Sequence, residues 1–225
     1  LNTFEEHRFH VILKARQLGL STLTAGYSLW MMTFHQDKNI LVIATKQEVA
    51  KNLVTKVRVM HANLPSWLKQ PCVEDNKLSL RYKNGSQIKA VASSEESGRS
   101  EALSLLIIDE AAFIVNGAEL YSAAITSLGT GGGAILISTP NGYDPLYYKT
   151  YEQSKTGKNQ YHIVEMRWFE DPRYNKDLRW TKKVEGGDDI VEAELEFNLP
   201  SYLSKIEDGW KPTSTWYENM CMALN

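Results

Sequence analysis

The feature that most constrains this 225-residue chain is the segment Leu103–Ile108, the most apolar strand-like run in the sequence, which is followed by two acids. A short apolar run of this kind is typical of a strand buried inside a sheet. Asp109 and Glu110 follow directly, so the pattern places Asp109 at the carboxyl edge of that strand. Because open α/β sheets bind ligands at this edge, the two acids are candidates for chemistry.

Two earlier segments repeat a strand followed by a helix. Phe9–Leu13 is apolar and β-branched, and apolar residues then recur at helical spacing between Leu23 and Phe34. Ile40–Ala44 is a second apolar run, followed by an apolar helical face between Ala50 and Met60. This alternation predicts an α/β fold with a mostly parallel sheet flanked by helices.

The remaining chain predicts an antiparallel hairpin near 76–92, because Asn84-Gly85 is a strong hairpin-turn signal. Gly131-Gly132-Gly133 predicts a turn leading into the strand Ala134–Ser138. We therefore expect a core domain over 1–168.

Beyond Trp168, capping patterns predict short helices, so residues 169–225 are expected to form a small helical lid or linker subdomain.

Composition excludes several classes of protein. The hydrophobic fraction of 43% and the charged fraction of 23% are ordinary for a globular domain. No apolar run approaches the roughly 18–20 residues that span a bilayer. Cys72 and Cys221 lack metal-ligand spacing, which favours a reducing compartment. We expect a soluble, cytosolic protein without a membrane partner, and the abrupt ends at Leu1 and Asn225 suggest a piece of a longer chain.

The net charge of −2 hides an asymmetry along the chain. Residues 1–60 carry 8 basic and 4 acidic side chains, whereas residues 161–225 carry 8 and 13. A tight, sequence-general DNA clamp needs a dense basic stripe, and none is visible. Any contact of this chain alone with nucleic acid should therefore be weak.

The segment after the first strand partly matches a phosphate-binding loop, G-x-x-x-x-G-K-[ST]. Gly19 and Ser21 fit, but Leu20 occupies the lysine position and Lys14 that of the first glycine. A lysine at the start of the loop can fold back over phosphates, and Arg16 offers a second cation. The alternative is an ordinary strand-to-helix turn with solvated cations.

The acid pair and a later strand end strengthen the phosphate-loop interpretation. In such ATPases the first acid, here Asp109, holds the magnesium shell, and the second, Glu110, can polarise the attacking water. The alternative is a pair of helix-capping acids. Residues 137–142 (ISTPNG) place a hydroxyl and an amide at the same edge, where they could sense a γ-phosphate or, alternatively, simply satisfy a turn.

Arg99, the histidines and Ser138 are further candidates for chemistry. Arg99 lies in a polar loop before the acidic strand and could reach a neighbouring subunit's nucleotide, or instead pair with Glu95 or Glu96. The five histidines have no partners at metal-ligand spacing. Ser138 lacks the G-x-S-x-G setting of a hydrolase nucleophile.

The assembled motifs resemble the ATPase domain of the large terminase subunit, the DNA-packaging motor of tailed bacteriophages. The matching pieces cover roughly residues 9–155, and their wording is specific. They are KARQLGLST, ILVIATKQEVAKNL, SSEESGRS, LLIIDEAAF and ILISTPNG.

The resemblance implies the RecA-like branch of P-loop NTPases, which carries an additional catalytic glutamate, here Glu110. It implies ATP and Mg²⁺ as cofactors, with Ser21 and Asp109 around the magnesium. Arg16 matches an arginine that acts on the nucleotide of its own subunit. Arg99 matches the region of an arginine finger, which acts on the nucleotide of a neighbouring subunit. The resemblance leaves both assignments open. The implied ATP-binding residues are Lys14, Ala15, Arg16, Gln17, Leu18, Gly19, Leu20, Ser21 and Thr22, and the implied coupling motif is Ser138, Thr139, Pro140 and Asn141.

The implied function is a motor in the host bacterial cytoplasm that hydrolyses Mg-ATP to move double-stranded DNA into a procapsid. Its partners would be DNA, the portal protein, the small terminase subunit and further copies in a ring. The sequence departs from the family's pattern in two ways. Residues 1–8 lack the family's adenine-contacting glutamine motif, so we expect this piece alone to bind ATP poorly. The family's nuclease domain is absent from it, so we expect it not to cut DNA. The alternatives are a RecA-like helicase or translocase and a non-hydrolysing scaffold with a degenerate P-loop.

Overall fold

The computed structural model describes residues 2–93, 102–183, 187, 190–192 and 204–223. The chain divides into two compact units, Leu1–Glu165 and Met166–Asn225. In the described part, no helix is long and apolar enough to cross a membrane.

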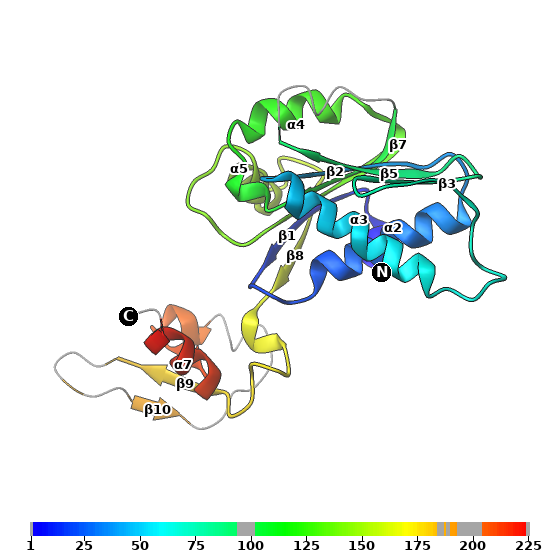
Figure 1. The fold of residues 1–225 in the computed structure, drawn as a ribbon. Helices are drawn as coiled ribbons and strands as arrows, with labels where there is room; N and C mark the ends of the chain where they lie inside the picture. Colours follow the sequence, from blue (N-terminus) through cyan, green and yellow to red (C-terminus); the bar gives the residue numbers. More distant parts are fainter. Residues whose placement is uncertain (1, 94–101, 184–186, 188–189, 193–203, 224–225) are drawn as a thin grey trace. The chain divides into compact units, whose positions relative to one another are not determined.

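The first unit alternates strands and helices, as Figure 1 shows. In chain order its elements are α1 (Asn2–Glu6), β1 (Phe9–Lys14), α2 (Leu20–Phe34), β2 (Asn39–Ala44), α3 (Gln47–Ala62), β3 (Cys72–Asp75), β4 (Ser79–Tyr82), β5 (Gln87–Ala92), β6 (Leu103–Asp109), the 3₁₀ turn η1 (Ala111–Phe113), α4 (Gly117–Ile125), β7 (Leu128–Ser138), α5 (Tyr147–Lys155) and β8 (His162–Met166).

The strands form one eight-stranded sheet in the order β3-β4-β5-β2-β6-β7-β1-β8. The pairs β5–β2, β2–β6, β6–β7 and β7–β1 are parallel, while β3–β4 and β4–β5 are antiparallel. The mostly parallel sheet expected from the alternating pattern is therefore present. Since the central strands run the same way, Lys14, Ala44, Asp109 and Ser138 all end strands at one edge of the sheet.

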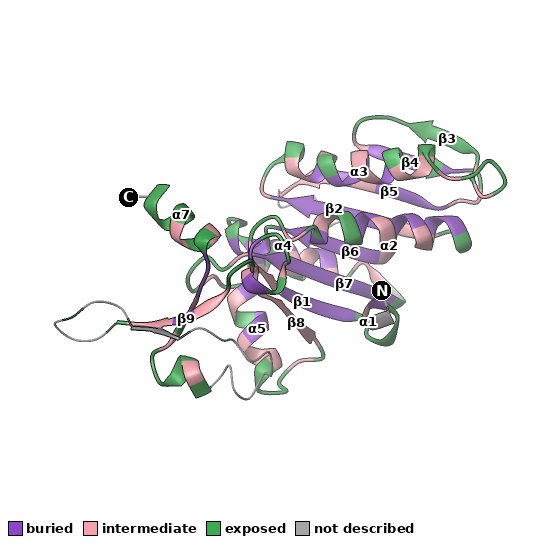
Figure 2. Ribbon diagram, turned by 90° about the horizontal axis from the view of Figure 1, so that it is seen from below, coloured by how far each residue is buried: buried purple, intermediate pink, exposed green. Residues whose placement is uncertain are grey.

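Helices cover both faces of the sheet, with α4 on one side and the contacting pair α2 and α3 on the other (Figure 1). The central strands are consequently buried throughout, as the purple strands of Figure 2 show. Val11, Val42, Ile107 and Leu136, from four different strands, are each 0% exposed. Burial on both faces explains why these strands read as continuous apolar runs.

Alternate residues of each strand face opposite helical layers. One core cluster joins Val11, Ile43, Ile108 and Leu136 to residues of η1, α4 and α5. Because strand side chains alternate, the residues between them face the α2 and α3 side. This parity carries beyond the core: Lys14 and Asp109 fall on the α2 side, and Ser138 falls on the η1 side.

The three consecutive glycines lie inside a strand, and the expectation of a turn there is wrong. β7 begins at Leu128, and its register with β6 shifts between Leu103 and Leu105, next to the glycines. A Cβ on Gly133 would lie 2.3 Å from the Arg8 carbonyl oxygen, and one on Gly132 would lie 2.6 Å from that of Leu103. Glycine is needed here because neighbouring backbone approaches too closely for a side chain.

Gly133→Ala should destabilise the fold, because the added methyl group clashes with backbone that cannot swing away. We expect a loss of about 1–3 kcal/mol in unfolding free energy, measured by urea denaturation. Gly26→Ala is the matched control: Gly26 lies in α2, where a Cβ meets nothing within 4 Å. That change should be neutral or stabilise by up to about 1 kcal/mol. Equal stability of the two variants would contradict the close-approach explanation.

Three histidines pack together where the strands β1 and β8 begin. The rings of His7 and His162 stack with centroids 4.0 Å apart, and His10 is 1% exposed with Nε2 2.9 Å from the Thr3 carbonyl oxygen. Burial lowers the pKa of His10 and of His162, which favours their neutral forms. The sequence did not indicate this cluster, because its members come from α1–β1 and β8.

The second unit contains a three-stranded antiparallel sheet in addition to helix, so the expectation of a helical subdomain is incomplete. Its strands are β9 (Arg179–Lys182), β10 (Ile190–Glu192) and β11 (Lys211–Thr213). Its helical parts include the 3₁₀ helix η2 (Trp168–Glu170) and α7 (Thr215–Ala223). Trp180 on the central strand is fully buried, which anchors this small sheet. Arg179 ties the sheet to α7 through an ion pair with Glu218.

Candidate active site

The loop between β1 and α2 is built to expose backbone N–H groups. Gly19 caps α2 with a left-handed φ of 77°, and no side chain caps this end of the helix. Gln17 is also left-handed, with φ 60°. The first turn of α2 closes on the Gly19 carbonyl, which accepts the N–H groups of Thr22 and Leu23. The N–H groups of such a helix start favour an anion such as phosphate.

Leu20 occupies the position of the usual P-loop lysine, and it is a core residue. Its side chain is apolar and only 4% exposed, so this position offers no positive charge to a ligand. Lys14, at the end of β1, instead lines the hollow in front of the loop together with Arg16. The positive charge that the loop offers therefore comes from its start and not from the usual lysine position.

A hydrogen bond joins the loop helix to the acidic strand. Ser21 Oγ donates to Asp109 Oδ2 at 3.0 Å, although the two residues are 88 positions apart. The Asp109 carboxylate is 7% exposed, and its Oδ1 accepts the backbone N–H of Glu110 at 3.0 Å. This brings together the hydroxyl and the carboxylate that the sequence assigned to a magnesium ion.

Glu110 leaves the strand through an unusual backbone conformation. Its φ is 55°, in the left-handed region that non-glycine residues rarely adopt. Such strain is typical of functional positions. The side chain is exposed, and its Oε2 accepts a hydrogen bond from Thr45 Oγ1 at 2.9 Å. Thr45 directly follows β2, so two neighbouring strand ends hold the carboxylate.

Two hollows meet at these residues. A cavity of about 630 Å³ is lined by Lys14, Arg16, Gln17, Thr45, Glu110, Phe113 and Thr139. A smaller cavity of about 200 Å³ is lined by Lys14, Ser21, Val49, Asn52, Leu53, Lys56, Asp109 and Glu110. Lys14 and Glu110 line both, so the two spaces share a wall. The larger volume is in the range of ordinary ligand sites.

The last strand end uses two polar side chains to satisfy backbone groups, which is the turn alternative that the sequence left open. Ser138 is fully buried and accepts the Ala112 N–H through Oγ at 3.2 Å. Asn141 Nδ2 donates to the Ala112 carbonyl at 3.0 Å. Both side chains thus hold η1, the turn that follows Glu110, and Thr139 is the residue of this segment that lines the cavity. Pro140 is exposed.

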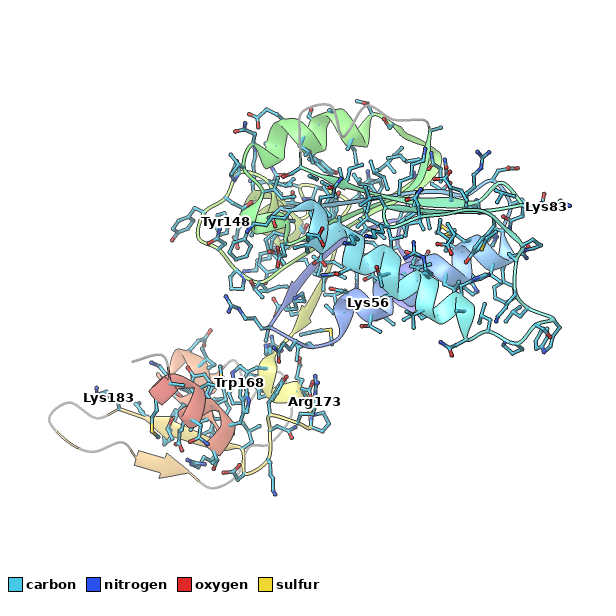
Figure 3. The ribbon with its side chains drawn as sticks, in the orientation of Figure 1. Lys56, Lys83, Tyr148, Trp168, Arg173 and Lys183 are labelled. Carbon is cyan, nitrogen blue, oxygen red and sulfur yellow. The ribbon has the colours of Figure 1, made fainter. Side chains whose placement is uncertain are left out.

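Residues that the sequence analysis missed also line the site. Thr45 follows the apolar strand β2, so the strand-end rule that selected Asp109 could have found it. Asn52 and Lys56 belong to α3, whose position beneath the sheet is visible in Figure 3, where Lys56 is labelled. With Val49 they form a helical stripe beside the apolar face of α3. Arg99 lies outside the described residues.

The donors present suit a magnesium ion held with a nucleotide. Mg²⁺ is commonly bound by one or two protein oxygen groups, with phosphate oxygens and waters completing its shell. Ser21 and Asp109 provide such a pair at 3.0 Å. Among the described residues, no three histidine, cysteine or acidic side chains gather into a self-sufficient metal site.

These features define a class of protein: an α/β domain of the RecA-like P-loop type, with an anion-binding helix start facing an acid pair on a neighbouring strand end. The chain belongs to the family of terminase large subunits, T4likevirus-type, N-terminal, whose model it matches over residues 11–217. It thus corresponds to the N-terminal part of a large terminase subunit.

Solved structures share this fold. The large terminase ATPase domain of Thermus phage P74-26 is 21% identical, with a TM-score of 0.55 over 72% of this chain and 75% of that one. The HK97 bacteriophage large terminase is 20% identical, with a TM-score of 0.57 over 81% of this chain and 37% of its own. The large terminase of thermophilic bacteriophage D6E in complex with ADP is 11% identical, with a TM-score of 0.54 over 72% and 40%.

Substitution of Leu20 and of Lys14 should change the unfolding free energy by different amounts, because Leu20 is a core residue and Lys14 lines the cavity. Leu20→Ala removes a buried side chain and should lower the unfolding free energy by about 2–5 kcal/mol. Lys14→Ala removes a half-buried cation at the cavity and should change unfolding by less than about 1 kcal/mol. Chemical denaturation without nucleotide measures both. A stable Leu20→Ala variant would show that this position is not part of the core.

Proposed function

We propose that this domain hydrolyses Mg-ATP in the two adjoining hollows and that hydrolysis drives double-stranded DNA into a procapsid. The observation that carries the proposal is the Ser21–Asp109 hydrogen bond, because it unites the phosphate-loop helix with the acid pair. The D6E relative has been solved with ADP, which supports nucleotide binding at this fold.

The residues divide the work of phosphoryl transfer, which is mainly positioning and charge stabilisation. The N–H groups at the start of α2 and the cations Lys14, Arg16 and Lys56 would hold the phosphates. Ser21 and Asp109 would hold magnesium, which supplies charge neutralisation on the phosphate oxygens when bound. Glu110 would accept the proton of the attacking water, as a general base must.

Thr139, Ser138 and Asn141 would couple the site to motion. Ser138 and Asn141 hold the peptide of Ala112, two residues beyond Glu110, while Thr139 lines the cavity. A change at the nucleotide could therefore be passed to η1 and α4 through this segment. One of two arginines would serve as the arginine finger: Arg16 on the nucleotide of its own subunit, or Arg99 on that of a neighbouring subunit.

The wider assembly follows from the family. We propose that the large subunit acts in the host cytoplasm as a ring at the portal protein, with the small terminase subunit and DNA as partners. The charge distribution of this chain supports weak DNA contact by the domain itself.

Phosphate release by the full-length protein tests the catalytic assignments. Glu110→Gln should abolish turnover by removing the base, and Lys14→Ala should abolish it by removing a phosphate cation. General-base loss alone is worth about 10²–10⁴-fold.

The outcomes distinguish the competing interpretations. If Glu110→Gln releases no phosphate but Lys14→Ala releases it at the parental rate, Arg16 or Lys56 supplies the cation that holds the phosphates. If the parent neither binds nor hydrolyses Mg-ATP, the domain is a non-hydrolysing scaffold with a degenerate loop.

Magnesium dependence tests the assigned ligands. Asp109→Asn and Ser21→Ala should each raise the Mg²⁺ concentration for half-maximal turnover by about tenfold or more. Ser28→Ala is the control, since Ser28 lies two turns further along α2 and its hydroxyl donates to the Thr24 carbonyl. An unchanged magnesium requirement in Asp109→Asn would remove Asp109 from the metal site.

A further inference from the structure

Another hollow lies at the edge of the sheet opposite the candidate active site, where the parallel strands begin. Its volume is about 320 Å³, at the lower end of the range of ligand sites. Ser104 lines it at the start of β6, whereas Asp109 ends that strand, so the two sites lie roughly 17 Å apart along β6. The lining of this amino-edge hollow includes Phe4, Arg8, Tyr27, Trp30, Lys38 and Ser104.

Two cations, Arg8 and Lys38, reach the amino-edge hollow from the residues directly before β1 and β2. Arg8 is held in place, because its Nε and Nη2 donate to the Gly132 carbonyl at 3.0 and 2.6 Å. A guanidinium has five N–H donors, so Nη1 keeps donors for a further partner.

The charge of the lining favours an anion. Among the residues that the structure describes, neither Arg8 nor Lys38 forms an ion pair with a carboxylate. Glu5 is the one acid among the described lining residues, so the positive charges outnumber the negative one. A cleft lined by an excess of one charge attracts ligands of the opposite charge.

Aromatic rings form another part of the lining. Tyr27 and Trp30, both from α2, stack with ring centroids 5.5 Å apart and planes inclined by 19°. Phe4 packs against Tyr27 at 5.1 Å, and His35 meets the Trp30 ring edge-on at 5.0 Å. Trp30 is half-buried, so part of its ring stays accessible from the hollow. Aromatic surfaces of this kind favour stacking with a flat ring such as a nucleobase.

We propose that the amino-edge hollow binds a small anion that carries an aromatic ring, which is the chemistry of a nucleoside monophosphate. Arg8 and Lys38 would contact the phosphate, and Trp30 and Tyr27 would contact the base. Every base has a π-face, so we expect little preference among bases. This site is separate from the proposed ATP site and does not depend on ATP hydrolysis.

Isothermal titration calorimetry of the full-length protein with AMP tests the proposal, with Mg²⁺ and ATPγS at saturation to occupy the proposed ATP site. We expect one AMP to bind per chain. Lys38→Gln should raise the Kd for AMP by about tenfold or more, because a hydrogen bond to a charged group is lost. Trp30→Leu should raise it by about fivefold or more, because stacking on the base is lost.

Lys149→Gln is the matched control. Lys149 is an exposed lysine of α5 that does not line the hollow, so its loss should leave the Kd for AMP unchanged. Circular dichroism checks that each variant folds, and Trp30→Phe replaces Trp30→Leu if the latter does not.

Further ligands test the two halves of the recognition. Inorganic phosphate and adenosine should each bind more weakly than AMP, since each lacks one of the two groups. A 5′-phosphorylated trinucleotide that binds more tightly than AMP would support the same chemistry and assign its source to the end of a DNA strand.

An absence of AMP binding by the parent, or a parental Kd in Lys38→Gln, would overturn the proposal. A Kd for inorganic phosphate equal to that for AMP would overturn recognition of the ring, and an equal Kd for adenosine would overturn the role of the cations. A protein that binds AMP in this way but never releases phosphate from ATP would overturn the proposed function and leave this inference standing.

Discussion

The parallel pairing of β2, β6, β7 and β1, buried on both faces, is the constraint on which the rest of this structure depends. Because the strands run the same way, their carboxyl ends lie along one edge. Because they are covered on both sides, their backbone positions are fixed by packing. Lys14, Thr45, Asp109 and Thr139 therefore all lie at or just beyond strand ends along this edge. The site takes its precision from the sheet beneath it.

Strand parity divides that edge into two functional sides. Asp109 falls on the side of α2 and meets Ser21, whereas Ser138 falls on the side of η1 and holds Ala112. The proposed magnesium ligands and the proposed coupling residues thus lie on opposite faces of adjacent strands. Glu110 lies between them, since its left-handed backbone turns the chain out of β6 and into η1. Strain of this kind persists only where surrounding structure enforces it.

The cations of this site occupy positions other than that of the lysine in the usual phosphate-binding loop. Leu20 fills core volume at the start of α2, and the charge is moved to Lys14, with Arg16 and Lys56 nearby. Cations on three separate elements can surround phosphates from several directions. The proposed phosphate contact of α3 follows from this arrangement, because α3 carries Lys56 to the smaller cavity.

The sequence by itself determined the parallel α/β class, the strand-to-helix connection within 14–22 and the acid pair at the end of β6, because apolar runs and strand-end residues are local patterns. Only the tertiary structure decided what depends on register and packing. The glycines of β7 lie in a strand, where the backbone of Arg8 and Leu103 comes too close to Gly133 and Gly132 for a side chain, and the second unit includes a sheet. Thr45 and Lys56 join the site because β2 pairs with β6 and α3 packs beneath them. Contacts between residues far apart in sequence leave no local signal, so pattern alone could not place them.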